Sequence, residues 1–222
     1  MAQIIIFGAG ETAEMAFEYF THDSPHEVIA FCVEREYLKT DRLCGLPVVA
    51  FEEVETHYPP ESHKAFVAIS YTKLNRVRTR LYLAVREKRY QCVSYVSSRA
   101  FVWHNVEIGE NCFIMEQNVL QYHVRVGNNV VLWSGNHIGH RTAIGDNVFI
   151  SSHVVVSGYC EIGENCFLGV NSSVANNLKI ARDNVIGMGA VINRDTEERK
   201  VYVGNPGKPL PKDSFSVFGV AG

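Results

Sequence analysis

Two histidines in residues 133–141 have the chemistry of a general base. His137 directly precedes the aliphatic residue Ile138, and His140 follows it by two positions. An unperturbed imidazole titrates close to neutral pH, so it can accept a proton from an amine under physiological conditions. An exposed histidine can equally be a solvated surface residue, and the residues alone leave both interpretations open.

A glycine-rich turn near the N-terminus has the context of a phosphate-binding site. Gly8 and Gly10 follow the apolar run of residues 3–7 and precede a segment with helical spacing. Ala13 stands where the dinucleotide fingerprint has its third glycine, and Glu34 ends the next predicted strand, where an acid can bind a ribose hydroxyl. Nucleotide-sugar binding, a redox dinucleotide and a purely structural turn all remain possible.

The elements that would position these residues alternate between strands and helices over residues 1–95. This pattern predicts a small α/β domain with a parallel sheet. Ligands bind at the carboxyl ends of the strands in such sheets, so we expect Ser70 and Asn75, which follow another strand, to lie near the glycine turn. The predicted strands cover residues 3–7, 28–33, 48–49 and 65–69, and the predicted helices residues 11–20 and 75–88.

Residues 96–192 carry a strict six-residue repeat. Every sixth position is Val, Ile or Leu, seventeen times in succession. A period of six is a multiple of two and does not fit an α-helix, so it predicts short strands stacked as a parallel β-helix. Residues 108–113 recur unchanged as residues 162–167, an offset of nine hexapeptides, which suits coils of three sides. The repeat positions are Val96, Val102, Ile108, Ile114, Leu120, Val126, Leu132, Ile138, Ile144, Ile150, Val156, Ile162, Leu168, Val174, Ile180, Ile186 and Ile192.

The composition narrows the choice of partners. A formal net charge of -3 gives no electrostatic reason to expect binding to nucleic acid or to an acidic membrane. No apolar run reaches transmembrane length, and no basic segment precedes the apolar residues 4–7. We therefore expect no signal peptide and a cytoplasmic protein.

The cysteines and the C-terminal segment are expected to be structural. The six cysteines form no CxxC pair, and Cys112, Cys160 and Cys166 each stand two residues before a repeat aliphatic. Period-two alternation then places these three side chains in the core. Residues 198–222 contain the Pro- and Gly-rich stretch 204–209, which predicts an irregular tail.

These features together resemble the hexapeptide acyltransferases, whose repeat forms a left-handed parallel β-helix and whose active sites lie between the subunits of a trimer. A Rossmann-like Gly-x-Gly domain, the repeat and a Gly-Asn-Pro tail resemble more closely the sialic-acid O-acetyltransferase-like group. That group includes the nucleotide-sugar N-acetyltransferases of the bacillosamine and perosamine type. The resemblance implies a nucleotide-sugar-binding domain over residues 1–95, an acyltransferase β-helix over residues 96–197 and an irregular tail over residues 198–222.

The resemblance also implies roles for individual residues. The family's catalytic base is a histidine two places after a repeat aliphatic in this coil, which corresponds to His140. One coil later, Gly158 matches the glycine whose N–H meets the thioester carbonyl and stabilises the oxyanion. Val170, Gly187 and Met188 match family contacts to acetyl-CoA.

One position departs from the family pattern. The family usually has an acid directly after the catalytic histidine, which orients the ring, but Arg141 stands there. Arginine cannot accept a hydrogen bond from imidazole, and its charge disfavours the protonated ring. Asp146, Asn136 and Asn118 are the candidate orienting groups. Asn118 and Asn136 occupy equivalent positions of successive coils, so they either contact the sugar or form a structural amide ladder.

A metal site is not expected. The β-helical carbonic anhydrases bind zinc through histidines on a similar architecture, and His104 precedes His140 by two predicted coils. Their pattern needs a third histidine a few residues after the second, and residues 144–146 contain none.

The resemblance therefore implies an acetyl-CoA-dependent N-acetyltransferase. Its substrate would be the 4-amino group of a nucleotide-linked 4-amino-4,6-dideoxyhexose, in the biosynthesis of a bacterial surface glycan such as lipopolysaccharide O-antigen. The nucleotide could be dTDP, UDP or GDP, and the expected assembly is a homotrimer. Alternatives are a sugar O-acetyltransferase acting on sialic acid, which would need a more strongly activated base, and a non-catalytic scaffold.

Overall fold

A computed structural model describes residues 1–221, which divide into two compact units. The first unit comprises residues 1–70 and 78–95, and the second comprises residues 71–77 and the chain from residue 96 onward. Among the described residues, no helix has both the length and the apolarity needed to cross a membrane.

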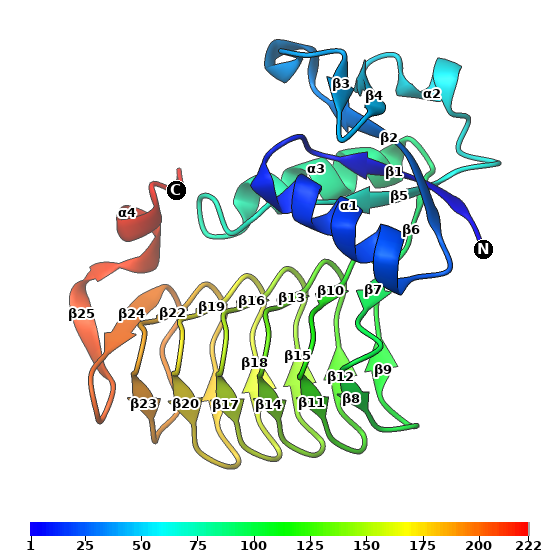
Figure 1. Cartoon of the computed structure of the whole chain (residues 1–222). Helices are drawn as coiled ribbons and strands as arrows, with labels where there is room; N and C mark the ends of the chain where they lie inside the picture. The colour runs from blue at the N-terminus through cyan, green and yellow to red at the C-terminus, as the bar shows by residue number, and fades with distance from the viewer. Residues whose placement is uncertain (222) are drawn as a thin grey trace. The chain divides into compact units, whose positions relative to one another are not determined.

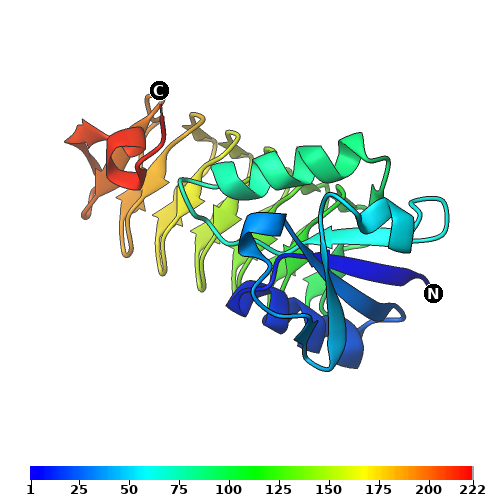
Figure 2. The ribbon, with the colours of Figure 1, turned by 90° about the horizontal axis from the view of Figure 1, so that it is seen from above.

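The first unit is a six-stranded sheet with the strand order β3-β4-β2-β1-β5-β6 (Figure 1). All neighbouring strands are parallel except β3 and β4. The helices α1 and α3 lie on opposite faces of this sheet (Figure 2). The elements are β1 (Gln3–Phe7), α1 (Glu11–Asp23), β2 (Glu27–Val33), β3 (Arg42–Leu43), β4 (Leu46–Ala50), α2 (Val54–His57), β5 (Lys64–Val67), α3 (Arg76–Glu87) and β6 (Gln91–Cys92), with a short 3-10 turn at Arg35–Tyr37.

Apolar side chains at helical spacing pack the helices of this unit against the sheet. On α1 they are Ala13, Ala16 and Phe20, and the Phe20 ring meets the Phe66 ring of β5 edge-on at 4.9 Å. On α3 they include Leu81 and Val85, which join the core of the sheet's other face. The α/β domain with a parallel sheet that the sequence predicts is confirmed.

The second unit is a three-sided parallel β-helix. Each coil contributes one two-residue strand to each of three sheets, and each strand pairs in register with the equivalent strand of the next coil, as in the pair Phe113–Val131. The first sheet contains β7 (Tyr95–Val96), β10 (Phe113–Ile114), β13 (Val131–Leu132), β16 (Phe149–Ile150), β19 (Phe167–Leu168) and β22 (Val185–Ile186). The second contains β8 (Phe101–Val102), β11 (Val119–Leu120), β14 (His137–Ile138), β17 (Val155–Val156), β20 (Ser173–Val174) and β23 (Val191–Ile192), and the third contains β9 (Glu107–Ile108), β12 (Arg125–Val126), β15 (Ala143–Ile144), β18 (Glu161–Ile162) and β21 (Lys179–Ile180).

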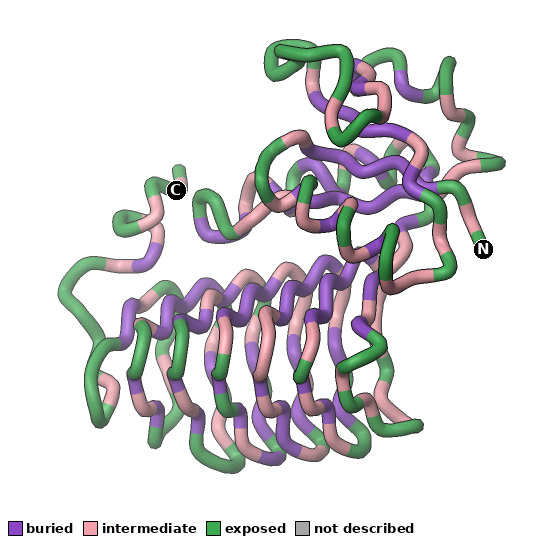
Figure 3. The backbone as a smooth tube through the Cα atoms, in the orientation of Figure 1, coloured by how far each residue is buried: buried purple, intermediate pink, exposed green. Residues whose placement is uncertain are grey.

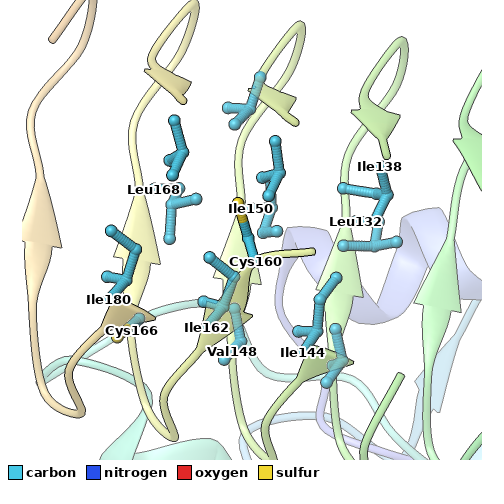
Figure 4. Close-up of a cluster of buried hydrophobic side chains, with 14 of the residues drawn as sticks. Leu132, Ile138, Ile144, Val148, Ile150, Cys160, Ile162, Cys166, Leu168 and Ile180 are labelled. Atoms are coloured by element: carbon cyan, nitrogen blue, oxygen red, sulfur yellow. The ribbon is translucent and has the colours of Figure 1, made fainter. Parts of the chain in front are cut away.

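The repeat aliphatics form the interior of the coil. From Ile114 to Ile192 all of them are buried (Figure 3), and they stack along the axis in one core cluster with the three predicted cysteines, of which Figure 4 shows Cys160 and Cys166. Burial raises the pKa of the Cys166 thiol to about 12, so this cysteine behaves as a small core residue rather than as a nucleophile.

A residue in the left-handed conformation marks most corners of the coil. Such residues recur every sixth position, and most of them are polar or aromatic rather than glycine. At one corner, Asn111, Asn129 and Asn147 form an amide ladder in which each Nδ2 donates to the next Oδ1 at 2.8 Å. These side chains therefore tie one coil to the next.

The C-terminal segment is regular, so the prediction of an irregular tail over residues 198–222 was wrong. The strand β24 (Lys200–Val203) pairs with β22 and continues the first sheet, and β25 (Lys208–Asp213) folds back antiparallel to it. Pro209 and Pro211 lie on β25, the edge strand of this sheet, where a missing backbone N–H costs nothing. The helix α4 (Ser214–Phe218) follows.

Residues 71–77 pack against the β-helix. Lys73, Leu74 and Asn75 have positive φ in succession, which is an unfavourable conformation outside glycine. Leu74 is buried with Val185 and Val201, and the Tyr71 ring contacts those of Phe149 and Phe167. This packing compensates for the strained backbone.

Candidate active site

One corner of the β-helix brings together the residues with catalytic chemistry. It follows the strands of the second sheet, and its successive coils place His104, Tyr122, His140, Gly158 and Asn176 in one column. We call this the histidine corner. The column that the sequence predicts for His104, His140 and Gly158 is confirmed by the strand register.

The imidazole of His140 lies directly against Gly158. A Cβ atom built on Gly158 would approach the ring atoms Cε1 and Nε2 to 2.6 and 2.7 Å, closer than any real contact. Only glycine fits at this position while the ring keeps its place. The ring is half-buried and is therefore held by the coil on one side and accessible on the other.

The group that orients His140 is Gln121, one coil earlier. Its Oε1 atom accepts the backbone N–H of His140 at 2.9 Å and lies 3.2 Å from the ring Nδ1. None of the three candidates named from the sequence has this role. The Oδ1 atom of Asp146 accepts the backbone N–H of Asn128 at 2.7 Å, at a different corner.

Aromatic rings enclose His140 on two further sides. The Tyr122 ring is parallel to the imidazole at 5.6 Å, and the Tyr159 ring meets it edge-on at 5.1 Å. The Arg141 guanidinium lies over the Tyr122 ring, 5.6 Å from its centroid. Arg141 is therefore engaged in a cation–π contact with Tyr122.

The backbone N–H of Gly158, predicted to stabilise the oxyanion, already has an acceptor. It donates to the Oδ1 atom of Asn176 at 2.9 Å. A thioester carbonyl can take this hydrogen bond only after the exposed Asn176 side chain has moved away. The sequence contained a signal for Asn176, because it stands one coil after Gly158 in the same column.

Asn118 and Asn136 are buried inside the coil, so the prediction that they contact the substrate was wrong. The Nδ2 atom of Asn118 donates to the carbonyl oxygens of Met115 and Trp133, both at 2.8 Å. Asn136 donates to the Trp133 carbonyl and accepts the backbone N–H of Val154 at 2.8 Å. Both amides stabilise backbone between coils, and neither side chain is open to a ligand.

The residues matched to acetyl-CoA lie at another corner, which follows the strands of the first sheet. Val170 and Met188 are exposed there, Met188 to 82%. Gly187 has little room, since an added Cβ would lie 3.0 Å from the Val203 side chain. We call this the donor corner; one side of the coil separates it from the histidine corner of the same chain.

The glycine turn of the first unit has the predicted backbone context. Gly8 has a φ of +133°, and a Cβ there would lie 2.7 Å from the carbonyl oxygen of Ala68. Gly10 caps α1, and its carbonyl oxygen accepts the N–H groups of Ala13 and Glu14 at 2.8 and 3.1 Å. The N–H groups that an anion could bind in this turn are therefore those of Glu11 and Thr12. Glu11 and Glu14 lie in the same turn, and their charges weaken its attraction for phosphate.

Glu34 is held by an ion pair. Its two carboxylate oxygens accept Nη1 and Nη2 of Arg80 at 2.6 and 2.7 Å. This bidentate hydrogen bond lowers the pKa of Glu34 below its usual range. A ribose hydroxyl would have to share this carboxylate with Arg80.

Ser70 and Asn75 belong to different units. Ser70 follows β5 in the first unit, and its carbonyl oxygen accepts Nη1 of the buried Arg78 at 3.0 Å. Asn75 is fully buried in the second unit, where Nδ2 donates to the carbonyls of Asn165 and Cys166. The prediction of Asn75 as a substrate contact was therefore wrong.

His104 has no partners suited to a metal. Within residues 1–221, no group of three or more His, Cys, Asp or Glu side chains is placed to hold an ion. The neighbours of His104 in its column are Tyr122 and then His140, two coils away.

Comparisons with known proteins agree with this architecture. The model of the bacterial transferase hexapeptide family (six repeats) matches residues 123–158 and 159–194, which include both His140 and Gly158. A search of the curated proteins finds no match to the chain.

Solved structures match over almost the whole chain. A mutant of perosamine N-acetyltransferase from Caulobacter crescentus, in complex with CoA and GDP-perosamine, superposes with a TM-score of 0.86 at 22% identity, over 96% of this chain and 98% of the other. The acetyltransferase domain of PglB from Neisseria gonorrhoeae gives 0.83 at 22% identity over 95% and 100%. WeeI from Acinetobacter baumannii gives 0.78 at 21% identity over 95% and 100%. The chain thus carries the bacterial transferase hexapeptide repeat and has the fold of these proteins, an α/β region followed by a left-handed parallel β-helix.

Proposed function

We propose that the protein is an acetyl-CoA-dependent N-acetyltransferase that acts on the 4-amino group of a nucleotide-linked 4-amino-4,6-dideoxyhexose. The observation that carries this proposal is the histidine corner, where a half-buried imidazole with an oriented ring lies against Gly158. The whole-chain likeness to a perosamine N-acetyltransferase that binds CoA and GDP-perosamine supports the choice of donor and acceptor. The product would enter a bacterial surface glycan, such as lipopolysaccharide O-antigen.

The reaction needs a base and an oxyanion donor. The sugar nitrogen attacks the thioester carbonyl carbon, and Nε2 of His140 accepts the proton that this nitrogen loses. The Gly158 N–H, released from Asn176, donates to the carbonyl oxygen as negative charge develops on it. The C–S bond then breaks, and the protonated imidazole returns the proton to the departing sulfur, so CoA leaves as the thiol. The amine is itself the nucleophile, so no acyl-enzyme is required.

We infer that the active assembly is a homotrimer. The second sheet presents mostly uncharged side chains outward, including the exposed Phe101 and Val155, whereas the third presents Glu107, Arg125, Glu161 and Lys179. An uncharged sheet face of this kind suits contact with another copy. The donor corner and the histidine corner lie on different edges of the coil, so acetyl-CoA would bridge them between neighbouring subunits. Use of acetyl-CoA as the donor supports a cytoplasmic location.

The first unit is proposed to bind the nucleotide. Gly8, Gly10 and Ser70 lie at the carboxyl ends of β1 and β5, where ligands bind in open α/β sheets. Glu34 directly follows β2 at the same edge, with its carboxylate already paired to Arg80. A ribose hydroxyl would therefore join this ion pair rather than meet a free acid.

A substrate screen tests the proposal. Thiol release from acetyl-CoA would be followed with dTDP-, UDP- and GDP-linked 4-amino sugars, and with sialic acid as a hydroxyl acceptor. We expect release with at least one amino sugar and none with sialic acid. Release with sialic acid alone would favour O-acetylation. Nucleotide binding without release from any acceptor would indicate a non-catalytic scaffold.

A further inference from the structure

The contact between Gln121 and His140 determines the orientation of the Gln121 amide. A backbone N–H can only donate, and the N–H of His140 lies 2.9 Å from the Gln121 side chain. The atom that faces it must therefore be the oxygen, because the amide nitrogen is a donor and cannot accept. Gln121 thus presents Oε1, not Nε2, to His140.

The amide orientation in turn determines the tautomer of the imidazole. The same Oε1 atom lies 3.2 Å from Nδ1 of His140, and an amide oxygen can only accept. Nδ1 must then carry the proton in the neutral ring, which leaves the lone pair on Nε2. Within residues 1–221, no group makes a hydrogen bond to Nε2.

We propose that Gln121 is the positioning residue of the reaction, which holds His140 as the Nδ1–H tautomer so that Nε2 can accept the proton of the acceptor amine. The role in catalysis rests on the proposed function, whereas the tautomer rests on the two hydrogen bonds alone. Gln121 would replace the acid that the family places directly after the histidine and that this chain replaces with Arg141.

A neutral orienting group has a specific consequence. A carboxylate in the place of the Gln121 amide would stabilise the protonated ring and shift its titration to higher pH. Within residues 1–221, the other titratable or charged groups in contact with His140 or its ring neighbours are Tyr122, Tyr159 and Arg141, and none of them is a carboxylate. The amide therefore orients the ring without adding negative charge to it.

The first test reads the tautomer without any turnover. Long-range proton–nitrogen NMR spectra of protein labelled with nitrogen-15 in its histidines would be recorded at alkaline pH, and the His140 signals assigned by their loss in His140→Ala. We expect the Nδ1–H form in the wild type and loss of that preference in Gln121→Met, which keeps the length of the side chain. An Nε2–H ring in the wild type would overturn the proposal.

The second test places a negative charge beside the His140 ring. Gln121→Glu should move the midpoint of the His140 NMR titration, and the acidic limb of kcat/KM for the acceptor, to higher pH by about one unit. Gln91→Glu makes the same exchange at an exposed position on β6 of the first unit and should leave both midpoints in place. Gln121→Met should lower kcat by about tenfold, a fraction of the roughly 10²–10⁴ that a general base contributes, with little change in KM.

These outcomes separate the two proposals. An equal shift of the titration midpoint in Gln121→Glu and Gln91→Glu would refute a direct contact between Gln121 and the ring. Expected NMR results in a protein that acetylates no amino sugar would leave the positioning contact intact and refute the proposed function instead.

Discussion

At the scale of single residues, three neighbours fix the orientation of the His140 ring. Gln121 hydrogen-bonds one edge of the imidazole, Tyr122 stacks against one face, and Gly158 leaves the space that the ring occupies. A ring restrained in this way can face a reacting amine without losing further conformational freedom, which lowers the entropic part of the reaction barrier.

The repeat of three hexapeptides per coil predicted part of this site. It placed His140 and Gly158 one above the other because both lie in one column of the coil. It missed Gln121, because that side chain reaches His140 diagonally from the neighbouring column of the coil before. It misplaced Asn118, Asn136 and Asn75, because spacing alone does not tell an amide that binds backbone from one that meets solvent.

Replacement of Asn176 by alanine should tighten the binding of acetyl-CoA. Its Oδ1 competes with the acyl carbonyl for the Gly158 N–H, and a net hydrogen bond is worth about 0.5–1.5 kcal/mol. The apparent KM for acetyl-CoA should therefore fall by about 2- to 10-fold. Steady-state kinetics with varied acetyl-CoA would measure this change in KM. A higher KM in Asn176→Ala would mean that this side chain contacts the donor rather than competing with it.

At the scale of elements, the repeat determined the β-helix because the central position of each side accepts only an aliphatic residue. The aliphatic at every sixth position must fill the coil, so periodicity alone identified all three sheets. The tail was different. Proline and glycine content suggested irregular structure, but β24 completes a sheet that already existed and β25 needs few donors at the edge. Tertiary pairing outweighed local composition.

The Asn111–Asn129–Asn147 ladder should be a main support of its corner. Asn129→Ala removes two hydrogen bonds of 2.8 Å, each worth about 0.5–1.5 kcal/mol net, and alanine in the φ of +57° costs about 1 kcal/mol more. We expect about 2–4 kcal/mol of destabilisation, measured by thermal unfolding. Asn129→Gly loses the same bonds without the backbone penalty and should be less destabilised. Equal losses in the two variants would show that the left-handed backbone costs alanine nothing.

The ion pair between Glu34 and Arg80 should make the first unit less stable in acid. The pKa of Glu34 is lowered in the folded protein, so its stabilisation is complete above the ordinary glutamate pKa of about 4.3 and is lost as pH falls through the lowered value. Both side chains are partly exposed, which limits the effect to about 1 kcal/mol, or about 2–4 °C in Tm.

Calorimetry of Glu34→Gln would show this dependence. The variant should melt below the wild type at neutral pH, and the difference should be smaller in acid, at a pH below the ordinary glutamate pKa of about 4.3. Glu87→Gln, an exposed position on α3, serves as the control for loss of one charge. A difference that is the same at both pH values would contradict the pair's contribution.

At the scale of the whole molecule, the proposed site is divided between two corners of the coil. His140 and Gly158 lie at one corner, and Val170 and Met188 lie at the other. A homotrimer in which the histidine corner of one subunit faces the donor corner of the next would bring them together. Light scattering should then give three times the chain mass of 24.9 kDa at micromolar concentration, and a monomer mass would refute the shared site.

Mixed trimers test the division directly. His140→Ala and the double variant Val170→Glu/Met188→Glu each damage one corner and should be nearly inactive alone. Heterotrimers isolated with two affinity tags should contain one intact site of three and recover about one third of the wild-type rate. Heterotrimers as inactive as both parents would place the donor and the base on the same chain.

The measurement that tests the central claim most directly compares the wild type with His140→Ala on an accepted amino sugar nucleotide. Acetylated product would be quantified by mass spectrometry over a range of pH. The wild type should add one acetyl group per sugar, with an acidic limb in kcat/KM. The variant should lose about 10²-fold or more in kcat, together with that limb, while it still binds both substrates. A variant with the wild-type rate and an unchanged limb would contradict the role of His140 as the base.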